Sequence, residues 1–104
     1  MNAAVLARLT LIYPPALEAT IIELLLEHEP ELPGFTTIDC EGHGADFDVA
    51  SVRERVRGRV ARGMLVMVLP QVGVDGVITA LAAHIRNPEV HWWVVPVSAY
   101  GQLA

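Results

Sequence analysis

The stretch from Met64 to Leu69 most constrains the fold, because every residue in it is apolar and Pro70 ends it. Successive side chains of a β-strand point to opposite faces of the sheet, so a strand of this composition needs apolar cover on both faces. Residues 4–13 and 91–97 have the same two-sided apolar character. The sequence therefore predicts a sheet that is buried on both sides.

Two segments carry apolar residues at helical spacing. The first follows Pro14-Pro15, which stops a strand and suits a first helical turn, and Pro30 ends it. The second is expected to hold His84 and Arg86 in its last turn, where positive charge complements the helix dipole. The two apolar stripes are Leu17, Ile21, Leu24, Leu25 and His28, and Val74, Val77, Ile78, Leu81 and Ile85.

Residues 35–40 are rich in β-branched side chains and predict a short second strand, which gives the order strand, helix, strand, strand, helix, strand. This is the α+β, ferredoxin-like βαββαβ sandwich, a four-stranded antiparallel sheet with two helices on one face. We expect one domain over residues 1–104, with a long loop at 39–63 between strands two and three. Within that loop we expect a helical turn at about 50–56 and a third strand that starts near Arg59.

The topology leaves one apolar sheet face without cover from the chain itself. Each Val, Leu or Met side chain left exposed to water would lose roughly 1.5–3 kcal/mol of the stabilising free energy that its burial provides. Packing of this face against other copies around a threefold axis would bury it, which predicts a homotrimer. The hydrophobic content of 53% agrees with burial by partners.

Composition also limits the compartment and the partners. No apolar run approaches the roughly 18 residues of a membrane span, so direct membrane insertion is not expected. The net charge of −5, with no lysine, argues against a nucleic-acid partner. A single cysteine and an N-terminus without a basic region indicate a cytoplasmic protein.

Polar chemistry is concentrated at residues 39–63, which hold the only cysteine and five of the seven arginines. Cys40 and His43 are candidate ligands for copper or zinc, which favour thiolate and imidazole. Gly42 and Gly44 would let the backbone turn the imidazole toward the sulfur. The alternative is a half-buried cysteine that ends a strand and a histidine in a glycine turn.

The loop arginines are candidates for binding an anion such as a phosphate, a nucleotide or a carboxylate, with Arg57, Arg59 and Arg62 as the expected site. The favoured alternative is that they pair with nearby acids, Glu41, Asp46, Asp48 and Glu54.

Other conspicuous residues predict packing rather than chemistry. Trp92 and Trp93 are adjacent on a strand and must point to opposite faces, one under the helices and one at the subunit interface. The sequence contains no nucleophile elbow, phosphate-cradling glycine loop or HExxH motif, so we do not expect an enzyme.

The order and spacing of six stretches carry a resemblance to known proteins: residues 9–18, 34–37, 41–44, 56–59, 93–97 and 101–103. Together they resemble a bacterial family catalogued as domain of unknown function 3240, within the PII-like superfamily of nitrogen regulatory PII and CutA-like proteins. This resemblance implies a trimeric regulatory protein. The family's association with heavy-metal efflux implies a metal-linked role and a membrane efflux or transport protein as a partner.

The resemblance to nucleotide-binding PII proteins breaks at the turn before the last strand. Those proteins carry a glycine- and lysine-bearing loop there, whereas this chain has Asn87-Pro88-Glu89. No basic residue follows Trp93 either. Both departures argue against ATP or ADP binding in the PII manner.

The leading hypothesis is therefore a PII-like trimeric regulatory protein that binds a small ligand or a partner protein through residues 39–63. A copper- or zinc-binding protein of metal tolerance is the alternative, and nucleotide binding through the loop arginines is the third.

Overall fold

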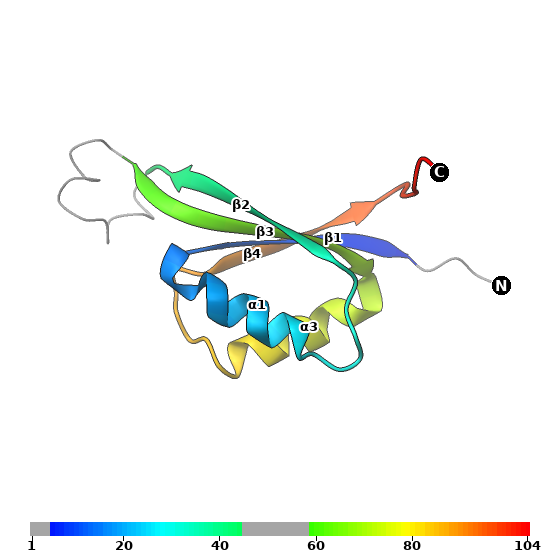
Figure 1. Ribbon diagram of the computed structural model, residues 1–104, viewed down its shortest axis with the longest axis horizontal. Coiled ribbons are helices and arrows are strands. Elements are labelled where there is room, and N and C mark those ends of the chain that lie inside the picture. Colours follow the sequence, from blue (N-terminus) through cyan, green and yellow to red (C-terminus); the bar gives the residue numbers. More distant parts are fainter. Residues whose placement is uncertain (1–4, 45–58) are drawn as a thin grey trace.

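The computed structural model of the protein describes residues 5–44 and 59–104. Within them, β1 (Leu6–Tyr13), β2 (Phe35–Gly42), β3 (Val60–Pro70) and β4 (His91–Val97) form one antiparallel sheet in the order β2-β3-β1-β4. Helices α1 (Glu18–Leu26) and α3 (Val74–Ala82) lie side by side on one face of this sheet (Figure 1). Short 3-10 turns, Pro15–Leu17 and Gln71–Gly73, lead into them. The predicted ferredoxin-like βαββαβ fold is confirmed.

The core lies between the helices and the sheet. Alternate residues of the central strands β1 and β3 point into it, as the two-residue period of a strand requires. Leu9 and Leu65 have no exposed surface, and Ile21 and Val77 close the core from the helix side. Among the described residues, the core cluster consists of Ala7, Leu9, Leu11, Tyr13, Ile21, Leu25, Leu65, Met67, Leu69, Val74, Val77 and Leu81.

The opposite face of the sheet has no cover from the described elements (Figure 1). Strand alternation places apolar side chains there, as the sequence predicted, and Ile38 and Trp93 remain 45% and 42% exposed. No helix among residues 5–44 and 59–104 has the length and apolar character that crossing a bilayer requires. The side chains on this uncovered face include Leu6, Thr10, Ile12, Ile38, Met64, Val66, Val68, Trp93, Val95 and Val97.

Tyr13 closes the core at the end of β1. Its ring lies over Gly63, the residue opposite it on β3, and a Cβ at position 63 would overlap that ring. The Tyr13 hydroxyl donates a hydrogen bond of 2.7 Å to Oε1 of Glu18, at the start of α1. Burial, with the Glu18 carboxylate as a second cause, raises the pKa of Tyr13 well above its ordinary value.

Several predicted boundaries were wrong. β2 continues to Gly42, two residues beyond its predicted end at Cys40, whereas β3 begins at Val60, close to its predicted start near Arg59. Residues 39–42 and 60–63 of the expected 39–63 loop are therefore paired strands. Their polar and glycine-rich sequence resembles a turn, but the outer part of this hairpin is not confined between other strands and tolerates such residues. β1 begins at Leu6, and α1 ends at Leu26, before His28. The predicted helical turn at 50–56 lies outside the described residues.

The end of the second helix also differs from the prediction. α3 ends at Ala82, so His84 and Arg86 lie beyond it and not in its last turn. Ile85 still donates a backbone hydrogen bond of 2.8 Å to Leu81, which continues the turn for three residues without a regular helix.

The Tyr13–Gly63 contact makes a testable prediction. Gly63→Ala should lower the free energy of unfolding by about 1–3 kcal/mol, because the added methyl must displace a buried ring. Gly76→Ala on α3 is the matched control, since its new Cβ meets nothing within 4 Å. This control should raise stability by roughly 0.5–1 kcal/mol through helix propensity. Urea unfolding at one fixed protein concentration measures both, and a neutral Gly63→Ala would contradict the packing described.

Candidate functional site

The hairpin of β2 and β3 extends past the end of β1. Tyr13, the last residue of β1, pairs with Gly63, so residues 60–62 of β3 pair only with residues 40–42 of β2. On the other side of β1, β4 begins with His91 opposite Ile12. The turn at residues 87–90 and the base of the hairpin therefore flank the end of β1.

A groove of about 440 Å³ occupies this region, on the uncovered side of the sheet. It brings together segments that are far apart in the sequence, namely the β2–β3 hairpin, the end of β1 and the start of β4. It combines a guanidinium, a carboxylate, a thiol, an imidazole and two indole rings. The residues that line it are Ile12, Cys40, Glu41, Gly42, Arg62, Met64, His91, Trp92 and Trp93.

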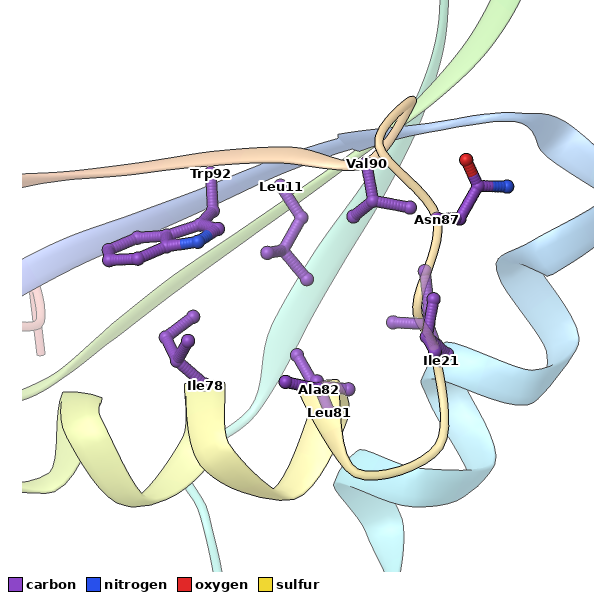
Figure 2. Close-up of a pocket in the computed structure, with 9 residues that line it drawn as sticks. Leu11, Ile21, Ile78, Leu81, Ala82, Asn87, Val90 and Trp92 are labelled. Carbon is purple, nitrogen blue, oxygen red and sulfur yellow. The ribbon is translucent and has the colours of Figure 1, made fainter.

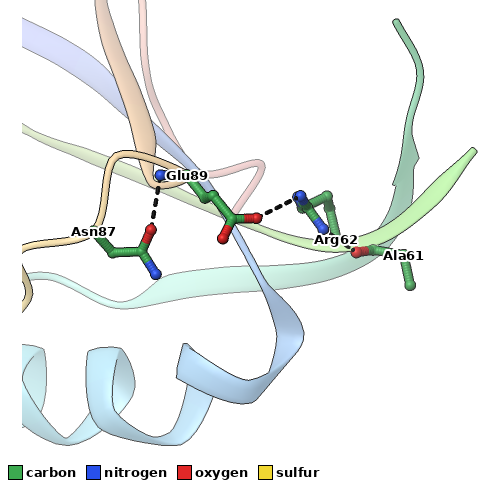
Figure 3. Close-up of polar contacts among 4 residues, drawn as sticks. All are labelled: Ala61, Arg62, Asn87 and Glu89. Carbon is green, nitrogen blue, oxygen red and sulfur yellow. Dashed lines mark hydrogen bonds and ion pairs between the residues drawn. The ribbon is translucent and has the colours of Figure 1, made fainter. Parts of the chain in front are cut away.

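Arg62 is the most informative of these residues, because its side chain is only 5% exposed. Its Nη2 lies 3.1 Å from Oε1 of Glu89, and its Nη1 donates a hydrogen bond of 2.9 Å to the carbonyl oxygen of Ala61 (Figure 3). Removing a guanidinium from water is costly unless a counter-charge and hydrogen bonds compensate it. The Glu89 carboxylate supplies that counter-charge across the end of β1.

The turn that carries Glu89 has internal hydrogen bonds. The Glu89 backbone N–H donates to Oδ1 of Asn87 at 2.8 Å (Figure 3). The Val90 N–H donates to the Asn87 carbonyl at 3.0 Å. An asparagine that bonds the backbone two residues ahead is a common way to fix a turn. The position of the Glu89 carboxylate is therefore set by Asn87 as well as by Arg62.

Arg59, the second predicted anion ligand within the described residues, pairs with Glu41 across the hairpin. The Nε of Arg59 lies 3.0 Å from Oε2 of Glu41, with side chains 41% and 49% exposed. Exposed pairs of this kind contribute only about 0.2–1 kcal/mol. The structure therefore shows the acid pairing that the sequence offered as the alternative for Arg59. Arg57, the third predicted ligand, lies outside the described residues.

The structure places the two predicted metal ligands on an extended segment. Cys40 lies on β2 opposite Arg62 and is half-buried, whereas His43 follows the end of the strand. Because β2 stays extended through Gly42, at about 3.3 Å per residue, the Cα atoms of Cys40 and His43 lie roughly 10 Å apart. Among residues 5–44 and 59–104, no three His, Cys, Asp or Glu side chains gather into a metal-binding group.

The electrostatics around the thiol also disfavour a thiolate. Burial raises the pKa of Cys40, the Asp39 carboxylate raises it further, and the Arg62 guanidinium opposes both effects. Without a metal ion the thiol is therefore kept protonated at neutral pH, which makes it a weak nucleophile.

Sequence reasoning missed Glu89, Asn87 and His91 as parts of this region. The signal that could have found them is topological, since β1 is central in the sheet and ends at Pro14-Pro15. The strands on either side of β1, which are β3 and β4, must then face each other across the end of β1. Their register could not be fixed from the sequence.

A family model described as "Protein of unknown function (DUF3240)" matches residues 3–104. The chain belongs to this family. A search of functionally curated proteins found no match to the sequence.

Solved structures place this DUF3240 protein among PII-like folds. A crystal structure of a DUF3240 family protein from Shewanella baltica is 22% identical, with a TM-score of 0.76, and the alignment covers 98% of this chain and 100% of that one. The Bacillus subtilis GlnK–ATP complex has 13% identity and a TM-score of 0.69, over 94% and 86% of the chains. Arabidopsis thaliana PII bound to citrate has 20% identity and a TM-score of 0.68, over 91% and 79%.

The Arg62–Glu89 and Arg59–Glu41 ion pairs of this DUF3240 protein should differ in strength. Glu89→Gln should cost about 1–3 kcal/mol of unfolding free energy, because the carboxylate that faces the buried guanidinium is lost. Glu41→Gln, the matched control at the exposed pair, should cost less than about 1 kcal/mol. Urea unfolding measures the free energy of unfolding of both variants. Equal losses of unfolding free energy in the two variants would show that burial does not set the strength of the Arg62–Glu89 pair.

Proposed function

We propose that this protein is a PII-like regulatory protein that binds a small anionic ligand in the groove beside Arg62. The proposal rests on the buried guanidinium in the groove wall, which is 5% exposed and held by a carboxylate at 3.1 Å. Glu89 occupies the position that the carboxylate or phosphate of a ligand would take. Because the Glu89 side chain lies on a turn and is 27% exposed, a ligand could replace it without unfolding a strand.

The groove favours a small carboxylate over a nucleotide. Glu89 leaves a negative charge near any bound anion, which disfavours a polyphosphate. The turn at 87–89 has neither glycine nor lysine to cradle phosphates. Two proteins of similar fold support both ligand classes in principle, since GlnK was solved with ATP and a plant PII with citrate. The residues of this chain favour the second class.

A regulatory role suits these residues better than catalysis. The Cys40 thiol in the groove has a raised pKa, chiefly because it is partly buried, so it is a weak nucleophile. No described observation favours metal binding over anion binding. We therefore propose a cytoplasmic sensor that is not an enzyme, and that signals occupancy of the groove to a partner protein.

The β2–β3 hairpin is the surface that we propose for the partner. It projects beyond the helices and the body of the sheet (Figure 1). Its outer residues Asp39, Glu41 and His43 are exposed and polar. The groove lies at its base, so a ligand there is well placed to influence it. A membrane efflux or transport protein is the partner that the family resemblance implies.

Calorimetric titration of citrate and ATP at low ionic strength tests the ligand proposal. Citrate should bind more tightly than ATP, and Arg62→Gln should weaken citrate binding about tenfold or more, because a charge-assisted hydrogen bond contributes roughly 1.5–3 kcal/mol. Glu89→Gln should strengthen binding by removing the competing carboxylate. Arg86→Gln, at an exposed arginine outside the groove, is the matched control and should bind as the wild type does.

Two results would contradict this proposal. One is no binding of citrate to the wild-type protein. The other is a citrate affinity that Arg62→Gln and Glu89→Gln both leave unchanged, since the ligand would then lie elsewhere.

We further propose that the uncovered sheet face is the contact between three copies of the chain. Its apolar side chains, with Trp93 still 42% exposed, would each gain roughly 1.5–3 kcal/mol on full burial. The groove lies on the same face, so a second copy would border it. Ligand binding and assembly are then expected to depend on each other.

Light scattering after size-exclusion chromatography tests the assembly. The wild type should have a mass of about 34 kDa, three times the 11.3 kDa chain. Val66→Glu, in the middle of the uncovered face, should dissociate the assembly because it would bury an unpaired carboxylate. Val72→Glu, at a residue that is 95% exposed at the start of the second helical segment, is the matched control and should stay trimeric. A monomeric wild type at micromolar concentration would contradict the proposal.

A further inference from the structure

A second hollow lies on the helix side of the sheet, where α1, α3 and the start of β4 meet. Its volume is about 130 Å³. Figure 2 shows Trp92, Leu11 and Val90 pointing from the sheet side toward Ile78 and Leu81 on α3. Eight of its nine lining residues are apolar and the ninth is an asparagine: Leu11, Ile21, Ile78, Leu81, Ala82, Ile85, Asn87, Val90 and Trp92.

We propose that this cavity, on the helix side of the sheet, binds a small uncharged aromatic molecule; Trp92 is the one residue that lines both this cavity and the anion groove. Among residues 5–44 and 59–104 no charged side chain lines the cavity, so these residues offer no counter-ion to a carboxylate, a phosphate or an ammonium group. An apolar cavity of about 150 Å³ lined by leucine, isoleucine and phenylalanine stays dry and binds benzene. This hollow is of similar size and has similarly apolar walls, but it is partly open to solvent, since Ala82 is exposed and Trp92 is 49% exposed.

The backbone around the cavity is held by regular pairing and hydrogen bonds. Leu11 and Trp92 are paired in the register of β1 and β4. The segment after α3 is fixed by backbone hydrogen bonds from Ile85 to Leu81 at 2.8 Å and from Val90 to Asn87 at 3.0 Å.

Trp92 supplies the second argument for an occupant. It lies on the helix-facing side of β4, as predicted for one of the two tryptophans, yet it is 49% exposed instead of being packed under the helices. An aromatic ligand in the cavity would cover part of this indole and gain a ring–ring contact, which contributes about 0.5–1.5 kcal/mol beyond burial. Asn87 places a single amide at the wall, which suits a ligand with at most one polar group.

Benzene and benzoate titrated into the intact protein, followed by the NMR signals of the tryptophan indoles and the aliphatic methyl groups, test the proposal. Benzene should cause saturable shifts of the Trp92 indole N–H and of the Ile78 and Val90 methyls, and leave the Trp93 indole unmoved. Trp93→Phe assigns the two indole signals. Benzoate should bind at least about tenfold more weakly, because its carboxylate would be buried without a partner.

Ala82→Leu should weaken benzene binding at least tenfold, since its longer side chain would enter the cavity from α3. Ala83→Leu is the matched control, because its neighbouring position lies outside the cavity wall, and it should bind as the wild type does. The proposal is overturned if benzene produces no saturable shift, if the shifts fall on Trp93 instead, if benzoate binds equally well, or if Ala82→Leu binds as tightly as Ala83→Leu. The benzoate comparison needs no variant, so it decides the charge preference even if Ala82→Leu fails to fold.

Discussion

The early end of β1 at Pro14-Pro15 is the constraint from which the site follows. β1 is a central strand that must donate hydrogen bonds on both sides, which proline cannot do. It therefore stops at Tyr13, while β3 continues past it and β4 begins only alongside it. On the helix side, the Tyr13 ring covers Gly63 at this end of β1. On the other side, the ion pair between Arg62 and Glu89 lies across the same end. One pair of prolines thus produces both the projecting hairpin and the groove at its base.

The two faces of the sheet place similar residues in different physical situations. On the helix side, Leu9 and Leu65 are completely buried within the chain. On the other side, apolar residues of the same strands have no cover from the described elements, so the proposed assembly is expected to stabilise the protein. Charged pairs differ in the same way. Arg59 and Glu41 lie in water and contribute little, whereas the nearly buried Arg62 makes its contact with Glu89 a specific and consequential one.

The sequence predicted the fold well because the fold depends on patterns that a single chain displays. The two-sided apolar strand at Met64 to Leu69 and the helical stripes gave the element order and the uncovered face. The sequence was less informative at 39–63, where polar residues and glycines concealed a strand pairing that depends on the neighbouring strand. It identified Arg62 as a candidate but not Glu89, because the contact joins residues 27 positions apart across the end of β1. The cavity beside Trp92 lies where α1, α3 and the start of β4 do not pack closely together. No periodic pattern in the sequence predicts such a gap.

The central claim is that Arg62 holds an anion and that Glu89 occupies its place when the ligand is absent. A crystal structure of the protein grown in citrate tests this most directly. The account predicts a citrate carboxylate within hydrogen-bonding distance of the Arg62 guanidinium, with the Glu89 side chain turned away and the backbone of the 87–90 turn displaced little. A structure in which Glu89 remains on Arg62 while citrate binds at another place on the chain would contradict it.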